Sequence, residues 1–238
     1  MEDIFLKFQE SAQEYGISVT NSQLGQFQIY MEALLSWNEK VNLTTITEPA
    51  EVTVKHFLDS ILILHYYDLP LGAKIIDVGT GAGFPGLPLK ILRPDLSVTL
   101  LDSLNKRLIF ICDLLTKLGV KCNVVHARAE EYGRIEENRQ AFDFVVSRAV
   151  AKLPALCEYC LPFVKIGGVF VSMKGPDIGE ELESAENAVK LLGCTVSSVE
   201  NYRLPGGDGR SLVIIKRISP LSKEYPRRGV KISKKPLG

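Results

Sequence analysis

The sequence predicts an α/β protein with a Rossmann-like, mostly parallel sheet of seven strands and an N-terminal helical extension. Apolar residues recur at helical spacing through the first sixty-odd residues. From Lys74 onward, short apolar runs instead alternate with helical patterns. Such alternation is typical of a largely parallel sheet with helices on both of its faces.

The length and composition are those of an ordinary globular protein. The chain has 238 residues, of which 46% are hydrophobic and 24% are charged, so it can bury a substantial core without disulfides. Its start lacks the features of a signal peptide, and no run approaches the roughly 18 apolar residues of a membrane span. Five irregularly spaced cysteines fit reduced thiols. We therefore expect a cytoplasmic protein with no membrane partner.

Three helices are predicted for the extension, residues 1–66. The first places apolar residues from Ile4 to Ala12 on one face. The second begins near Ser22, with Asn21 as its N-cap. The third begins at Glu48-Pro49, where proline suits the first turn, and continues through "VTVKHFLDSILIL".

Strands and helices then alternate through the predicted core, residues 67–220. Apolar runs predict strands at 74–78, 97–101, 121–126, 143–147, 167–173, 194–201 and 211–217. Helical patterns lie between them, near 86–92, 105–118, 128–136, 152–163 and 178–192. The turn "LPGGDG" joins the last two strands, which predicts a hairpin and one antiparallel strand in the sheet.

The remaining segment, residues 221–238, is a basic tail. It carries six basic residues and one acidic residue, so its net charge is +5, and the other 220 residues sum to −5 because the whole chain is neutral. The segment has little apolar material, and we expect it to be loosely ordered in isolation.

A glycine-rich loop follows the first strand of the core, in the stretch "IIDVGTGAGFPGLPL". Asp77, Gly79, Gly81 and Gly83 form the pattern DxGxGxG, which differs from the GxGxxG of dinucleotide sites. Pro85 and a second proline remove amide donors that a pyrophosphate would use, and an aspartate is unfavourable beside phosphates. The loop therefore favours a ligand without phosphates over a dinucleotide, although a dinucleotide loop and a tight turn without ligand both stay possible.

S-adenosylmethionine (SAM) is a ligand without phosphates that suits this loop. It carries a sulfonium and an amino group that suit the neighbourhood of Asp77, and the glycines allow its close approach to the backbone. Asp102 ends the next strand, where a carboxylate can accept hydrogen bonds from both ribose hydroxyls. We assign Asp77, Gly79, Gly81 and Asp102 to cofactor binding.

The absence of certain motifs restricts which methyl-transfer reactions the sequence supports. The segment after the fourth strand, "FDFVVSRAVA", has no NPPY or DPPY motif of DNA amino-group methyltransferases, and no Pro-Cys pair supports a covalent thiolate route. Cys157 and Cys160 form a CxxC without a partner pair, so we expect no metal. No catalytic base stands out, which fits an acceptor with a free lone pair, such as N7 of guanine, because its attack needs alignment alone.

The assembled motifs resemble the RsmG family, also called GidB. The resemblance spans nearly the whole chain, and the segments "GTGAGFPG" and "SRAVA" are its most specific parts. Further matching segments are "WNEKVNLTTI", "HFLDS", "LLDSLNKRLIFI", "ARAEE" and "YPRRG". The resemblance implies a SAM-dependent methyltransferase that acts on N7 of a guanine in a decoding-region loop of bacterial 16S rRNA.

The resemblance also implies site residues. Cofactor contacts fall on Gly79 and Phe84 in the loop, on Ala129 and Glu130 near the adenine, and on Arg148, to which we also assign the catalytic role. Without the resemblance, the acids after the third strand would indicate a helix start. The implied partner is 16S rRNA or the small ribosomal subunit, and we expect a monomer.

Basic residues are the candidates for RNA contact. They are Lys174, Arg227, Arg228, Lys231, Lys234 and Lys235. A solvated lysine and a solubilising tail are the alternatives. Gly229-Val230 depart from the proline that relatives often carry after the arginines, which leaves the tail conformation open. We expect removal of residues 221–238 to weaken RNA binding and to leave SAM binding intact.

Three other questions stay open in the sequence. His56 and Asp59 lie three residues apart and can share a helix face, either in a core hydrogen bond or in a site. A small-molecule methyltransferase is one alternative function, and the basic tail argues against it. A nucleotide-binding regulator that uses NAD is the other.

Overall fold

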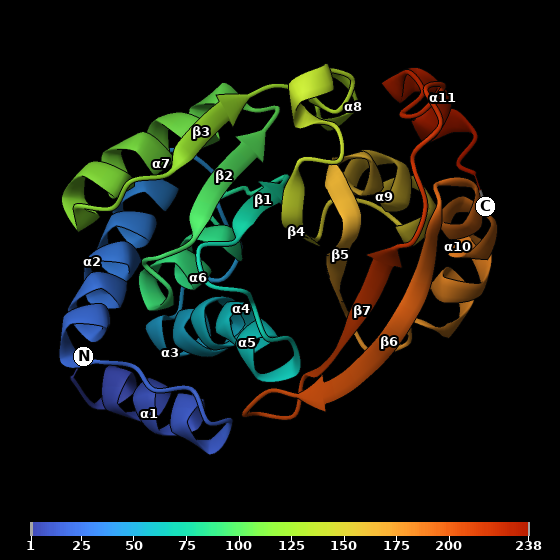
Figure 1. Cartoon of the computed structure of the whole chain (residues 1–238). Helices are drawn as coiled ribbons and strands as arrows, with labels where there is room; N and C mark the ends of the chain where they lie inside the picture. The colour runs from blue at the N-terminus through green and yellow to red at the C-terminus, as the bar shows by residue number, and fades with distance from the viewer. Residues whose placement is uncertain (1, 238) are drawn as a thin grey trace.

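The computed structural model describes residues 2–237, and its centre is one seven-stranded sheet (Figure 1). The strand order is β3-β2-β1-β4-β5-β7-β6. The strands are β1 (Lys74–Val78), β2 (Ser97–Asp102), β3 (Asn123–His126), β4 (Phe142–Arg148), β5 (Val164–Lys174), β6 (Cys194–Arg203) and β7 (Gly209–Arg217). Strands β1 to β5 pair in parallel, while β7 runs antiparallel to both β5 and β6. The predicted parallel sheet with a final hairpin is confirmed.

Alternation along each strand divides the apolar side chains between the two faces of the sheet. Ile75 and Leu100 belong to one buried cluster, whereas their neighbours Ile76 and Leu101 belong to the other. The first cluster packs beneath α6 (Gly86–Leu92) and α7 (Asn105–Leu118), and the second beneath α9 (Leu153–Cys160) and α10 (Gly179–Leu191). The bounds of β1, α6 and α7 agree with those predicted. No helix within residues 2–237 has the length and apolarity needed to cross a membrane.

The predicted helices at 128–136 and 152–163 are shorter than expected. Residues 129–132 form α8 (Ala129–Tyr132), and a separate 3₁₀ turn, η2 (Glu136–Asn138), follows it. Likewise α9 ends at Cys160 and gives way to a second 3₁₀ turn, η3 (Leu161–Phe163). Pro162 interrupts the helical pattern there because it lacks an amide donor.

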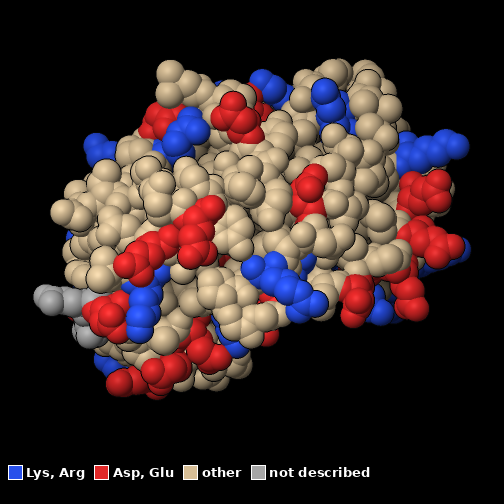
Figure 2. Space-filling view, turned by 90° about the horizontal axis from the view of Figure 1, so that it is seen from below, with Lys and Arg blue, Asp and Glu red and all other residues tan. Residues whose placement is uncertain are grey.

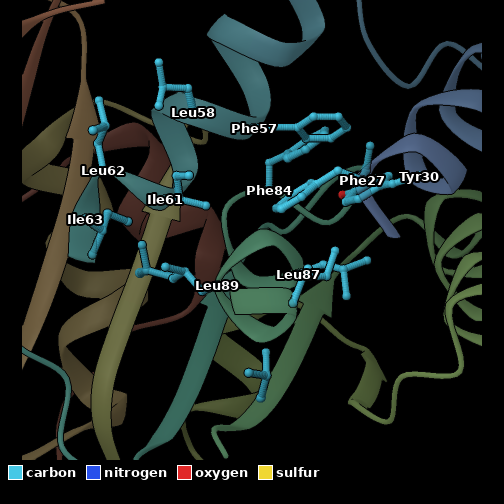
Figure 3. Close-up of a cluster of buried hydrophobic side chains, with 14 of the residues drawn as sticks. Phe27, Tyr30, Phe57, Leu58, Ile61, Leu62, Ile63, Phe84, Leu87 and Leu89 are labelled. Carbon is cyan, nitrogen blue, oxygen red and sulfur yellow. The ribbon is translucent and has the colours of Figure 1, made fainter. Parts of the chain in front are cut away.

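The N-terminal helices belong to the first cluster. They are α1 (Glu2–Glu14), α2 (Asn21–Asn38) and a third stretch composed of α3 (Pro49–Val52), the π-helical segment η1 (Thr53–Leu58), α4 (Asp59–Ile61) and α5 (Ile63–Tyr66). Figure 3 shows Phe27 and Phe57 from these helices beside Phe84 from the glycine loop. The extension therefore shares its core with the sheet and contacts the loop directly.

The N-cap of α2 differs from the prediction. Thr20, and not Asn21, caps the helix, because its hydroxyl accepts from the Gln23 amide at 3.3 Å. The Gln23 side chain in turn accepts from the Thr20 amide at 2.9 Å. This reciprocal pair of hydrogen bonds is a capping box. It favours Thr20 over Asn21 as the N-cap, because Gln23 lies three positions after Thr20.

The basic tail is packed, contrary to the expectation of a loosely ordered segment. Leu221 and Tyr225 are buried with the second cluster, and Ile232 is buried within the helix α11 (Gly229–Lys234). In Figure 1, α11 lies beside α8, above the carboxyl ends of the parallel strands. The composition of the tail did not predict this packing, because Leu221 and Tyr225 are buried by apolar residues from elsewhere in the chain.

Candidate functional site

A cavity of about 950 Å³ opens at the carboxyl edge of the sheet. Parallel pairing brings the ends of β1, β2 and β4 together, so the loops that follow these strands lie side by side in its wall. The turn before α8, one side of α11, the end of β5, Arg210 of β7, and Lys55, His56 and Asp59 of the third helical stretch also belong to the wall. Of the predicted cofactor residues, all but one line this cavity: Gly79, Gly81, Phe84, Asp102, Ala129, Glu130 and Arg148.

Asp77 is the exception, because it lies beneath the loop. Its side chain is fully buried, and its Oδ2 accepts from the Thr80 hydroxyl at 2.7 Å and from the Gly86 amide at 2.9 Å. A Cβ on residue 86 would lie 2.8 Å from the Asp77 Cβ, so glycine is required there. Asp77 was expected to bind the cofactor. It instead binds Thr80 and the start of α6, and it does not line the cavity.

The loop itself is folded against the end of β2. Gly79 and Gly81 adopt φ values of +73° and +60°, which favour glycine. The Gly79 and Thr80 amides both donate to the Leu101 carbonyl, at 2.8 and 3.0 Å. With the Gly86 amide engaged by Asp77, the amides at the start of α6 offer little to a pyrophosphate.

Asp102 is almost fully buried and joins the loop to β2. Its Oδ2 accepts from the Gly81 amide at 2.9 Å, and its Oδ1 accepts from the Leu104 amide at 2.8 Å. Arg107, which the sequence analysis missed, also lines the cavity and donates to Asp102 at 3.4 Å. The Arg107 Nε is buried and has no partner among the described residues. This corner of the cavity thus combines a carboxylate with spare donor capacity.

Phe84 is the centre of an aromatic stack at the cavity wall. The Tyr30 ring stacks on it at 5.1 Å between centroids, with an interplanar angle of 3°. The His56 ring also stacks on it, at 4.6 Å, and the Arg148 guanidinium carbon lies 5.0 Å from its centroid. Phe84 thereby connects the N-terminal helices to the cavity.

Arg148 is held by three acceptors on the third helical stretch. It donates to the Lys55 carbonyl at 3.1 Å, to Asp59 Oδ2 at 3.2 Å and to His56 Nδ1 at 3.1 Å. Burial, followed by the positive charge of Arg148, lowers the pKa of His56 to about 3. Since a guanidinium can only donate, Nδ1 accepts, and the proton of the neutral ring lies on Nε2, 2.8 Å from the Thr44 hydroxyl. His56 and Asp59 therefore both accept hydrogen bonds from Arg148, at the wall of the cavity.

Asp59 also connects to the last hairpin of the sheet. The Tyr202 hydroxyl donates to its Oδ1 at 2.8 Å, and Arg210 Nε lies 3.6 Å from its Oδ2. Burial and the charge of Asp59 raise the pKa of Tyr202. Arg210 lines the cavity, and sequence reasoning missed it because more than 140 positions separate it from Asp59.

Two predicted RNA contacts are already engaged in ion pairs. Lys174 lies 2.6 Å from Glu181 and donates to the Ala151 carbonyl at 2.8 Å. Arg227 binds the fully buried Glu158 through Nε and Nη2, at 2.9 and 2.7 Å. Both cations are therefore already paired with a carboxylate of the chain, and their assignment to RNA contact stays a prediction.

The other four predicted RNA contacts are exposed. A second hollow of about 550 Å³ has Glu224, Val230 and the ion-paired Arg227 in its wall. It is also lined by Arg134 and by the four predicted contacts on and beside α11, which are Arg228, Lys231, Lys234 and Lys235. Within residues 2–237, none of these five cations forms an ion pair. Their charges are therefore available to a polyanion.

The described residues contain no metal-ligand cluster of histidine, cysteine, aspartate and glutamate. The CxxC cysteines, Cys157 and Cys160, are buried thiols, and burial raises the pKa of both. Their surroundings thus favour the protonated thiol over the thiolate that binds metal.

The chain is similar in sequence to one family of known proteins. A family model described as rRNA small subunit methyltransferase G matches residues 23–211. Ribosomal RNA small subunit methyltransferase G of Desulforamulus reducens is 45% identical over 239 residues, covering 100% of both chains. The protein of the same name from Alkaliphilus oremlandii is 48% identical over 231 residues, covering 96% of each chain.

Solved structures share the fold at much lower identity. A precorrin-6y C5,15-methyltransferase from Geobacter metallireducens has a TM-score of 0.52 and 18% identity, over 74% of this chain and 91% of that chain. A SAM-dependent methyltransferase from Aquifex aeolicus has a TM-score of 0.51 and 18% identity, over 73% and 96% of the two chains. The predicted Rossmann-like fold of SAM-dependent methyltransferases is confirmed.

Proposed function

The chain belongs to the rRNA small subunit methyltransferase G family, and on this basis we propose that it methylates N7 of a guanine in a decoding-region loop of 16S rRNA. The observation that carries the proposal is the cavity at the carboxyl edge of the sheet, where the residues expected to bind SAM come together. The 16S substrate implies that the enzyme acts in the cytoplasm. We propose further that it acts as a monomer without a metal.

The cavity residues fit SAM. A volume of about 950 Å³ lies within the usual range for ligand sites. Asp102 would accept from the ribose hydroxyls, while Ala129 and Glu130 would border the adenine. The open glycine backbone at Gly79 and Gly81 would lie against the amino-acid portion. SAM, when bound, supplies an electrophilic methyl group on its sulfonium.

The protein residues would act chiefly by positioning. N7 of guanine has a lone pair at neutral pH, so no side chain has to remove a proton. Arg148 lines the cavity, and its three acceptors fix the guanidinium at the wall. A guanidinium has five N–H groups, so the three bonds leave two for a ligand or the base. We assign Arg148 the contact that aligns the reacting partners.

Methyl transfer from labelled SAM to 16S rRNA and to the small subunit, with mass-spectrometric identification of the nucleoside, tests the proposal. We expect 7-methylguanosine at a single position. Methylation of another atom or only of small molecules would contradict it. Binding of NAD in place of SAM on calorimetry would instead support the regulator.

Arg148→Lys tests the assigned residue. A lysine ammonium has three donors without the planar geometry of a guanidinium, so it cannot hold the three acceptors and also contact a ligand. We therefore expect the transfer rate to fall by about 10²-fold or more. Arg93→Lys is the matched control, because Arg93 pairs with Asp95 in a loop at the opposite edge of the sheet. Equal rates for the two variants would remove Arg148 from the mechanism.

A further inference from the structure

Helix α11 separates two hollows that have different chemistry. Gly229 and Ser233 face the large cavity, and Val230 lines both hollows. Lys231 and Lys234 line the basic hollow on the other side. The side toward the large cavity is thus uncharged, and the opposite side is cationic.

The segment before α11 anchors it to the core. Arg227 and the buried Glu158 form the ion pair described above, and Arg134 donates to the Pro226 carbonyl at 2.9 Å. Arg139 donates to the carbonyls of Tyr225 and of Ser222, the latter at 3.2 Å. These bonds fix where the chain enters α11, so the helix has a defined place above the sheet.

The start of α11 touches the cavity turn at Glu130. A Cβ on residue 229 would overlap the Glu130 carboxylate, so a larger residue there would have to displace the Glu130 side chain from its place beside α11. Glu130 is 7% exposed. The helix therefore covers the part of the cavity assigned to the adenine.

We propose that α11 is a wall of the cofactor site whose closure depends on an RNA backbone bound to its outer side. This inference rests on the proposed function and extends it to a coupling between the two ligands. Phosphates in the basic hollow would hold the helix, and a held helix would retain the cofactor. By linkage, bound cofactor would strengthen RNA binding by the same factor.

Charge repulsion within α11 supplies the physical reason. Lys231 lies three residues from both Arg228 and Lys234 and four from Lys235, so these cations are neighbours on the helix surface. Like charges at such spacings destabilise a helix, and α11 has only six residues. Phosphates would remove this repulsion, whereas the free protein retains it.

The coupling is measured with S-adenosylhomocysteine, whose affinity is determined by calorimetry with and without a 16S rRNA fragment that carries the decoding-region loop. For the full-length protein we expect RNA to tighten the affinity by about three- to thirtyfold, a range typical of coupled sites. The double variant Lys231→Gln/Lys234→Gln should show no such tightening by RNA. Its affinity for S-adenosylhomocysteine in the absence of RNA should not be weaker than that of the unaltered protein. Lys121→Gln, a change in an exposed loop before β3, should preserve the tightening.

Two further variants test the wall itself. Removal of residues 229–238 should weaken S-adenosylhomocysteine binding at least tenfold without RNA, which reverses the expectation stated for the tail. Gly229→Ala should also weaken it, and Gly25→Ala, where the added methyl meets open space, is its control. Melting curves establish that each variant is folded, and Gly229→Ala provides the test if the truncation does not fold.

The outcomes distinguish the two proposals. If the full-length protein binds no S-adenosylhomocysteine, the proposed function fails. If it binds and the affinity is the same with RNA as without, or is unaffected by Gly229→Ala, the inference about α11 is wrong and the proposed function stands.

Discussion

A single buried carboxylate organises the glycine loop. Asp77 holds both Thr80 and Gly86, so it fixes the two ends of the loop relative to β1. Its Oδ1 has no partner among residues 2–237. Burial is the main reason that the pKa of Asp77 is raised to about 6, while its hydrogen bonds to Thr80 and Gly86 act in the opposite direction.

The raised pKa of Asp77 predicts a pH dependence of stability. The folded protein retains the proton up to about pH 6, whereas the unfolded chain releases it near its ordinary value of 3.8. Stability from this group is therefore full at low pH and is lost as pH rises through 6. We expect Asp77→Asn to lessen the fall in unfolding free energy between pH 4 and pH 7 by about 2–3 kcal/mol.

Urea unfolding at these two pH values checks this prediction. Other titrating groups are present in both proteins, so the difference between the two pH responses isolates Asp77. An identical fall in the wild type and in Asp77→Asn would show that Asp77 does not titrate in this window.

At the scale of elements, the glycine loop is held between the sheet and the N-terminal helices. The Tyr30 hydroxyl donates to the Ala82 carbonyl at 2.5 Å, and a Cβ on Gly83 would lie 2.5 Å from that hydroxyl oxygen. Figure 3 shows Tyr30 and Phe57 on the same side of the loop as Phe84. Helix α2 and the π-helical segment η1 therefore support the cofactor loop from outside the sheet.

Tyr30→Phe tests this support. The change leaves a buried carbonyl without its donor, so we expect the unfolding free energy to fall by about 1–2 kcal/mol. S-adenosylhomocysteine affinity should fall by up to about tenfold, because the loop loses its contact with α2. Tyr67→Phe is the control, since no described residue bonds its hydroxyl, and calorimetry compares the two. An unchanged affinity in Tyr30→Phe would show that the loop keeps its shape without α2.

On the scale of the whole molecule, charge is divided between surfaces. The net charge of zero combines a tail of +5 with a body of −5. Figure 2 shows the lower face of Figure 1, where acidic and basic groups are interspersed without a continuous basic area. The exposed cations of the tail lie instead at the opposite edge, beside the cavity. RNA is therefore expected to approach from the carboxyl edge of the sheet.

The shared core predicts that the extension and the sheet unfold together. Trp37 is the sole tryptophan, and from α2 it donates to Asp113 of α7 at 2.9 Å. Its fluorescence should therefore follow the same transition as far-ultraviolet circular dichroism. Phe8→Ala, which removes a buried ring of α1, should lower both midpoints equally.

Leu71→Ala is the control for this experiment, because Leu71 is 88% exposed and its removal should leave both midpoints unchanged. Separate transitions for fluorescence and circular dichroism, or a shift of only one of them in Phe8→Ala, would show that the extension is an independent unit.

Sequence reasoning succeeded where a local pattern determines local structure. The apolar spacing of residues 105–118 specifies a helix, and the run at 74–78 specifies a strand, whatever packs against them. It was less accurate for the tail. There Leu221 and Tyr225 are buried by contacts with distant segments, which composition within the tail does not reveal.

By itself, the sequence determined the class of fold, the glycine loop and the family, because these depend on periodicity, spacing and motif. Only the tertiary structure decided which side chains meet. It placed Asp77 beneath the loop, joined Arg148 to His56 and Asp59, and set α11 against Glu130. The physical reason is that buried polar groups need partners, and the strand order, rather than separation along the chain, determines which partners lie within reach.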